Sequence, residues 1–229
     1  MFFPDRITRL APGHRVLEIG PGADPHPRSD VLLEMAFDDP AEYANQFGHG
    51  RMLATDKPVV YYDGRRFPFK DGEFDYVICS HVLEHVPDVE AFLGEVFRVA
   101  KRGYFEYPLC YYDYLYNIGA HVNYLKHHDG VLRFMKKSDS PLDAFKPVQA
   151  LLFQSLNKGY THTLNHLLPW IMEGFEWEQP FRAERVRNLE AVCHASADLP
   201  VKQEKPLYTF GPKRLLRELY RSVRYRQRY

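Results

Sequence analysis

The sequence has no long hydrophobic run. Nowhere in its 229 residues do about 18 consecutive apolar residues occur, the length that a membrane-spanning helix requires. The first ten residues include Asp5, Arg6 and Arg9, where a signal peptide needs an apolar core. These absences predict a cytoplasmic location.

Cysteine is scarce, and its spacing contains no metal or disulfide motif. Cys79, Cys110 and Cys193 are odd in number and form no CxxC pair, which argues against a disulfide framework and against a thiolate zinc site. We expect reduced thiols in the core. The content of 45% hydrophobic and 26% charged residues is that of an ordinary globular protein, so disorder as the main state is excluded.

Net charge is also lacking, because 30 basic and 30 acidic residues cancel. The balance hides a basic C-terminus, since residues 212–229 hold seven basic residues and one acidic residue. We expect an amphipathic helix here, with Leu215, Leu219 and Val223 on one face. It would pack on the acidic body or lie peripherally on the inner face of a membrane. A nucleic-acid partner is disfavoured, since the remainder of the chain is acidic.

Short apolar runs bounded by turn residues alternate with loops and one helical pattern in the first half of the chain. Asp88 is placed to cap a helix that ends before Gly103. This alternation predicts an α/β fold with a mostly parallel sheet and helices on both faces. The predicted strands are residues 15–20, 31–34, 59–62, 74–80 and 104–107.

The half after Pro108 has weaker patterns. Tyrosines and histidines crowd residues 111–128, where we expect an irregular lid or an inserted subdomain. Helical spacing covers 146–157 and 164–172, and strands are expected at 131–135 and near 175–181.

Acidic residues and glycines follow the predicted strands. Ligands of parallel sheets bind at the carboxyl ends of the strands, so these residues form one candidate site. Its members are residues 18–22, Glu34, Asp63, Ser80 with His81, and Glu106 with Tyr107.

The first of these loops argues against a dinucleotide. In the dinucleotide fingerprint a third glycine lets a helix point its N-terminus at a pyrophosphate, but Pro25 stands at that place. Only seven residues separate Gly22 from Asp30, too few for a full helix. A nucleoside without phosphate remains a candidate ligand, because Glu34 can accept hydrogen bonds from both ribose hydroxyls and Asp63 can accept one from an adenine amino group.

Three stretches carry a family resemblance: RVLEIGPG at 15–22, DGRRFPFKDGEFDYVICSHVLEHV at 63–86 and FLGEVFRVAKRGYFEYP at 92–108. Together they resemble class I S-adenosylmethionine-dependent methyltransferases of type 11, over about residues 12–108. The resemblance implies a Rossmann-like core at 1–108 that binds S-adenosylmethionine. Residues 109–211 would add an acceptor-side insertion and the remaining core strands, and 212–229 the basic helix. The implied reaction is methyl transfer to a small-molecule, glycan or lipid-linked acceptor.

The resemblance also implies a role for each site residue. The family's first helix is shortened here, and we expect Asp24 and Arg28 to take over contacts with the ammonium and carboxylate of the cofactor. Methyl transfer mainly requires alignment and exclusion of water. A general base helps a hydroxyl acceptor, and the candidates are His81, His85 and Glu106. The remaining implied contacts are Glu18, Gly20 and Gly22 around the methionine part, Glu34 at the ribose, Asp63 and Gly64 at the adenine, and Ser80 and His81 beside the sulfonium.

Two other functions fit parts of the sequence. The shortened loop after Gly22 also suits a cofactor-binding scaffold without turnover. Residues 81–85, HVLEH, match the HxxEH pattern of zinc hydrolases, but Pro87 leaves no room for the long helix that such a site needs, so we predict no metal. In the simpler interpretation Glu84 and His85 cap or pair on the surface of a turn, and Glu106 pairs with an arginine.

Overall fold

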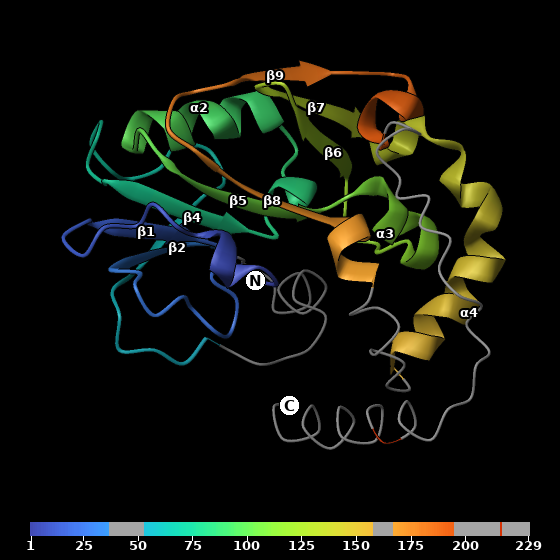
Figure 1. The fold of residues 1–229 in the computed structure, drawn as a ribbon, viewed down its shortest axis with the longest axis horizontal. Coiled ribbons are helices and arrows are strands. Elements are labelled where there is room, and N and C mark those ends of the chain that lie inside the picture. The colour runs from blue at the N-terminus through green and yellow to red at the C-terminus, as the bar shows by residue number, and fades with distance from the viewer. Residues whose placement is uncertain (37–52, 158–166, 195–215, 217–229) are drawn as a thin grey trace. The chain divides into compact units, whose positions relative to one another are not determined.

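The structure is a computed structural model and describes residues 1–36, 53–157, 167–194 and Leu216 (Figure 1). Its main sheet has six strands in the order β3-β2-β1-β4-β5-β8. The first five are parallel, and β8 runs antiparallel to β5. The predicted α/β fold with a mostly parallel, Rossmann-like sheet is therefore confirmed. The strands are β1 Val16–Ile19, β2 Val31–Met35, β3 Val59–Tyr62, β4 Tyr76–Ser80, β5 Gly103–Pro108 and β8 Met172–Trp177.

One face of the sheet packs against helix α2, Val89–Val99. The predicted cap is present, since the Asp88 carboxylate accepts a hydrogen bond from the Ala91 N–H at 3.0 Å. Phe92, Val96 and Val99 are buried against the sheet at helical spacing. Figure 1 shows α2 on the same side of the sheet as strands β6, Asn123–His128, β7, Val131–Lys136, and β9, Arg182–Arg185.

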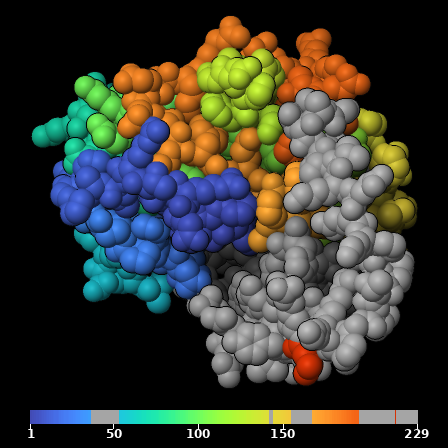
Figure 2. Space-filling view, viewed as in Figure 1, coloured from blue at the N-terminus to red at the C-terminus, as the bar shows by residue number. Residues whose placement is uncertain are grey.

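The N-terminal segment lies on the opposite face. Ile7 and Leu10 pack against Tyr76 and neighbouring side chains of β1, β4 and β5, and the short 3₁₀ helix η1, Pro4–Arg6, belongs to this segment. Glu176 of β8 fastens it by accepting hydrogen bonds from the Thr8 hydroxyl at 2.7 Å and the Arg9 N–H at 2.9 Å. In Figure 2 these blue N-terminal residues lie at the surface beside the orange segment that contains β8.

The irregular lid considered for residues 111–128 is wrong, because regular elements cover most of this stretch, while the inserted subdomain stays a prediction. Residues 110–116 form helix α3, Cys110–Tyr116, and β6 pairs antiparallel with β7, which pairs parallel with β9 in a second sheet. The hairpin turns at Asp129 and Gly130, which have φ values of 50° and 70°. Positive φ at both central residues is the geometry that Asp-Gly favours, so this signal was present in the sequence.

The later elements agree in part with expectation. Helix α4, Lys146–Asn157, is confirmed. Of the helix expected at 164–172, residues 167–171 are helical, Met172 begins β8, and 164–166 lie outside the described residues. The expected strand at 131–135 is β7, and β8 covers the first part of 175–181. The remaining short 3₁₀ helices are η2 Leu83–His85, η3 Lys137–Asp139, η4 Pro141–Phe145 and η5 Leu189–Val192.

The chain divides into two units, Met1–Cys193 and His194–Tyr229. The basic amphipathic helix predicted at 212–229 lies outside the described residues, apart from Leu216. Within the residues that are described, no helix has the length and apolar character to cross a bilayer. Cys79 and Cys110 are buried free thiols, and Cys193 is a half-buried one. The predicted boundary at residue 108 stays a prediction.

Candidate active site

The carboxyl ends of adjacent parallel strands bring the predicted cofactor residues to neighbouring positions. The Gly20 N–H donates to the Leu33 carbonyl at 2.9 Å, which joins the end of β1 to β2. At the next pair, Met35 of β2 lies beside Tyr62 of β3. A Cβ built on Gly64 would come 3.7 Å from the Met35 sulfur. The strand ends that carry Gly20, Glu34 and Asp63 with Gly64 are therefore consecutive in the sheet, and their joint role in binding a cofactor stays a prediction.

Gly20 occupies a position where only glycine fits without strain. Its φ is 61°, and a Cβ there would approach Val82 Cγ2 to 2.5 Å. Gly22 has a φ of 60°, and a Cβ added to it would meet no atom of the described residues within 4 Å. The turn after β1 thus presents bare backbone next to the residues that follow β4.

Glu34 is a buried carboxylate with few hydrogen bonds within the part of the chain that the structure describes. Its side chain belongs to a residue that is 7% exposed, and its hydrogen bond within the described residues comes from the Met35 N–H at 3.0 Å. Burial raises the pKa of Glu34 to about 7. Such a carboxylate can still accept hydrogen bonds from a ligand's hydroxyl groups.

The loop after β1 contains no helix, as expected from its length. Glu18 holds the loop from inside: its Oε2 accepts from the His26 N–H at 2.8 Å and from the Ser29 hydroxyl at 2.6 Å. Burial raises the pKa of Glu18 above its ordinary value. Lys57 holds the loop from the other side, because its Nζ donates to the carbonyls of residues 26, 27 and 29 at 3.1, 2.9 and 2.5 Å. Nothing in the local sequence around Lys57 indicates this role.

Three other predicted cofactor residues lie nearer the surface. Asp24 is exposed. The Nη2 of Arg28 donates to the carbonyls of Ala11 at 2.9 Å and Pro12 at 3.1 Å, so part of its guanidinium is bonded to the N-terminal segment. Asp63 is exposed, and its Oδ1 accepts from the Arg65 N–H at 3.0 Å. The ligand contacts expected of these residues stay predictions.

Glu106 at the end of β5 is saturated with hydrogen bonds. It accepts from the N–H groups of Phe2 at 2.6 Å and Phe3 at 2.9 Å. It also accepts from the Ser80 hydroxyl at 3.0 Å and the Tyr104 hydroxyl at 2.8 Å, and pairs with His81 Nε2 at 3.1 Å. The partner is thus a histidine, and the arginine considered from the sequence is not used.

The pair formed by His81 and Glu106 is ionised near neutral pH. Burial alone would raise the pKa of Glu106, but the hydrogen bond and charge of His81 and the other donors lower it to about 2. Burial likewise opposes the charge of His81, yet its contacts with Glu106 and Glu84 raise its pKa to about 9. A histidine that already carries its proton and a carboxylate with five donors are poor proton acceptors.

The expectation that Glu84 and His85 pair on the surface of a turn is wrong. Glu84 is completely buried in η2. The Asn123 side chain from β6 lies over this turn and donates to the carbonyls of Leu83 at 3.0 Å and Val86 at 2.7 Å. His85 is half-buried with its Nδ1 3.0 Å from the Ala120 carbonyl, and burial lowers its pKa. The HxxEH pair of zinc hydrolases is absent here, because His81 bonds to Glu106.

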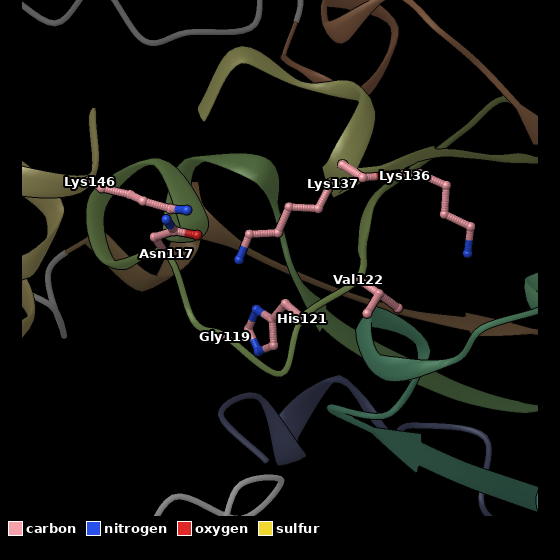
Figure 3. A pocket seen from close by; sticks show the side chains of 8 residues that line it. Asn117, Gly119, His121, Val122, Lys136, Lys137 and Lys146 are labelled. Carbon is pink, nitrogen blue, oxygen red and sulfur yellow. The ribbon is translucent and has the colours of Figure 1, made fainter. Parts of the chain in front are cut away.

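A cavity of about 450 Å³ lies beside the loop before β6, which contains His121 and Val122 (Figure 3). In Figure 3 the Lys137 side chain extends toward His121, whereas Lys136 extends away from it. The lining residue His121 belongs to an aromatic cluster, since Tyr112 lies 6.1 Å from His121 and 5.1 Å from Tyr116 between ring centroids. The cavity is lined by Asn117, Gly119, His121, Val122, Lys136, Lys137, Ser138 and Lys146.

Comparison with known proteins shows that parts of the chain are similar to methyltransferases. Residues 37–105 match the family model described as a methyltransferase domain. A sterol 24-C-methyltransferase of Schizosaccharomyces pombe is 29% identical over 175 residues, which are 70% of this chain and 45% of that protein. A demethylmenaquinone methyltransferase of Corynebacterium efficiens is 36% identical over 114 residues, 44% of this chain and 47% of that protein.

The matching region is a part of each known protein. The chain spans less than half the length of these two relatives. Among solved structures, an S-adenosylmethionine-dependent methyltransferase from Mesorhizobium loti matches with a TM-score of 0.32 and 17% identity, covering 45% of this chain and 49% of that one.

Proposed function

The chain carries the methyltransferase domain of the class I S-adenosylmethionine-dependent methyltransferases, and from this premise we propose that it transfers a methyl group from S-adenosylmethionine to a small-molecule or lipid-linked acceptor. The observation that carries the proposal is Glu34. It is a buried carboxylate at the end of β2, with one internal hydrogen bond among the described residues, between the bare backbone of Gly20 and the Asp63-Gly64 turn. Ribose hydroxyls would supply the donors that this carboxylate lacks.

The names of the relatives guide the choice of acceptor. They methylate a sterol and demethylmenaquinone, which are ring compounds of low polarity. Tyr112 and Tyr116 form an aromatic cluster with His121, which lines the cavity, and rings of this kind can pack against such an acceptor. We therefore favour an apolar ring acceptor over a glycan.

The residues near the sulfonium act by positioning in this proposal. Displacement at a sulfonium methyl needs two aligned reactants and little water, and alignment can supply about 7 to 11 kcal/mol. Glu106 and His81 fasten Phe2 and Phe3 over the ends of β4 and β5, and the Phe2 ring contacts His81 edge-on at 5.1 Å. In this proposal Glu106, His81 and the two phenylalanines keep water away from the sulfonium. Of the three candidate bases predicted from the sequence, His85 is the histidine whose pKa is lowered by burial, and its Nε2 makes no hydrogen bond among the described residues.

Calorimetry with S-adenosylhomocysteine tests the cofactor site. We expect binding by the wild type and at least tenfold weaker binding by Glu34→Ala, because a carboxylate that accepts from two hydroxyls contributes more than about 1.4 kcal/mol. Glu90→Ala, at an exposed position of α2, should bind like the wild type. No binding by folded wild-type protein would refute the proposal.

Turnover separates the enzyme from the scaffold. Purified protein incubated with methyl-labelled S-adenosylmethionine and a lipid extract should give a labelled product that partitions into organic solvent. Cofactor binding without any labelled product in lipid or aqueous extract would favour the scaffold.

A further inference from the structure

The Glu84 side chain is a buried carboxylate without a hydrogen bond among the described residues. The residue is 0% exposed, and neither side-chain oxygen has a hydrogen-bond partner there. Its Oε1 lies 3.3 Å from His81 Nδ1 and 3.9 Å from His85 Nε2. Burying a charge is costly unless it is paired and hydrogen-bonded or coordinates a metal. His81 pairs with Oε1, but neither oxygen of Glu84 is hydrogen-bonded among the described residues.

Two histidines beside Glu84 are fixed in the form that ligates metals. A carbonyl oxygen only accepts, so the contact of His85 Nδ1 with the Ala120 carbonyl places the ring proton on Nδ1. His121 Nδ1 lies 2.8 Å from the Asp113 carboxylate, which likewise holds a proton on Nδ1. A ring whose proton sits on Nδ1 offers the lone pair of Nε2 to a metal when it carries no second proton. The two rings lie 4.9 Å apart between centroids.

We propose that Glu84, His85 and His121 bind a divalent transition metal ion, with zinc the first candidate. One ligand atom from each residue lies within 4.8 Å of the other two. Two imidazoles and one carboxylate are a common zinc donor set. Tetrahedral bonds of about 2.0 to 2.2 Å separate ligands by roughly 3.3 Å, so binding draws the three atoms together by an ångström or so. A fourth coordination position stays open.

The second shell has the arrangement that supports metal ligands. A carboxylate behind a ligating histidine fixes the ring and raises its basicity, and Asp113 takes this place behind His121. Asp113 is itself buried and held, because its Oδ1 accepts from Lys137 Nζ at 2.8 Å and from the Ile118 N–H at 3.1 Å. The chain reverses at Asn117, whose φ of 47° ends α3, and so returns His121 to Asp113.

The site differs from the HxxEH pattern and does not depend on the proposed methyl transfer. Its second histidine comes from the loop before β6, which lies 36 residues beyond His85 in the sequence. His121 also lines the 450 Å³ cavity, so the metal would lie next to this cavity.

Metal binding can be measured directly on the full chain, purified without a polyhistidine tag, stripped with chelator and dialysed. We expect one equivalent of Zn²⁺ by calorimetry and one of Co²⁺, with Co²⁺ giving visible absorption bands of a site of low coordination number. Glu84→Gln and His121→Gln should each weaken binding at least a hundredfold. Asp113→Asn should weaken it about 10- to 100-fold, as second-shell changes do.

His128→Ala is the matched control. This histidine is 62% exposed, pairs with Asp129 and lies outside the cluster, so its variant should bind metal like the wild type. Circular dichroism and S-adenosylhomocysteine binding report whether each variant folds. If Glu84→Gln fails to fold, His121→Gln and Asp113→Asn decide.

Two outcomes overturn the proposal. The first is that the folded wild type takes up no stoichiometric Zn²⁺ or Co²⁺, which leaves the His81 side chain as the partner of Glu84. The second is that metal binds equally well to folded His121→Gln and to the wild type.

Discussion

The raised pKa of Glu34 should be visible in the pH dependence of the unfolding free energy. A solvated glutamate has a pKa near 4.5, and burial raises that of Glu34 to about 7. Below pH 4.5 Glu34 is protonated in both the folded and unfolded states, so its ionisation does not lower the unfolding free energy. Between pH 4.5 and 7 the unfolded chain ionises while the folded protein does not, and stability falls. The expected loss from this group between pH 5 and pH 8 is about 2.5 kcal/mol.

Urea denaturation at pH 5 and pH 8 measures this loss. The comparison is between the wild type and Glu34→Gln, which keeps the size and hydrogen-bonding capacity of the side chain but cannot ionise. The drop in unfolding free energy from pH 5 to pH 8 should be about 2.5 kcal/mol smaller in the variant. Glu90→Gln, an exposed substitution on α2, should leave the drop unchanged.

Ligand binding gives the same group a second test of opposite sign. Hydroxyl donors favour the ionised carboxylate, so S-adenosylhomocysteine should bind more tightly as pH rises from 5 to 7, by up to about tenfold per pH unit. Glu34→Gln should lose this dependence. Equal stability drops in the wild type and the variant would refute the buried, raised pKa, and pH-independent affinity in the wild type would refute the ribose contact.

Three further substitutions test the supports of the site. Gly20→Ala puts a Cβ against Val82 at positive φ and should lower the unfolding free energy by about 1 to 3 kcal/mol in urea; a neutral effect would contradict the tight turn after β1. Glu106→Gln should lower the unfolding free energy by about 3 to 5 kcal/mol and speed hydrogen exchange of the Phe2 and Phe3 amides, which Glu106 binds. Unchanged exchange of these amides would show that Glu106 does not hold the N-terminus. Lys57→Met removes three hydrogen bonds to the first loop and should cost about 1 to 3 kcal/mol while weakening S-adenosylhomocysteine binding; full affinity would show that the loop needs no such support.

The parallel sheet could be predicted because its signals are local. Each of the first five strands is a short apolar run, three of which end in glycine, an acid or a turn pair, and the structure places β1 to β5 within those runs or a residue beyond them. The helix cap at Asp88 is equally local. Since parallel strands align their carboxyl ends, the sequence could place Gly20, Glu34 and Asp63 at one edge of the sheet, whereas the strand order that makes these ends neighbours comes from the structure.

Most contacts of the buried carboxylates Glu84 and Glu106 could not be predicted, because the partners are distant in sequence. Glu106 forms hydrogen bonds with residues more than 100 positions away at the N-terminus. Glu84 lies near His121, and β5, α3 and the loop at Asn117 separate the two residues in the sequence. A histidine next to a strand suggests a base when its surroundings are unknown. In the folded protein the same His81 lies between two carboxylates.

The short first connection is compatible with a cofactor site because its polar groups are satisfied elsewhere. A helix would have bonded its own carbonyls, and buried backbone groups without partners are costly. Here Lys57 supplies donors to three of those carbonyls, and Glu18 accepts from the loop's N–H and hydroxyl groups. The turn at Gly20 therefore keeps its position beside Glu34 without the helix. It follows that the missing helix, which suggested a scaffold from the sequence, is weak evidence against turnover.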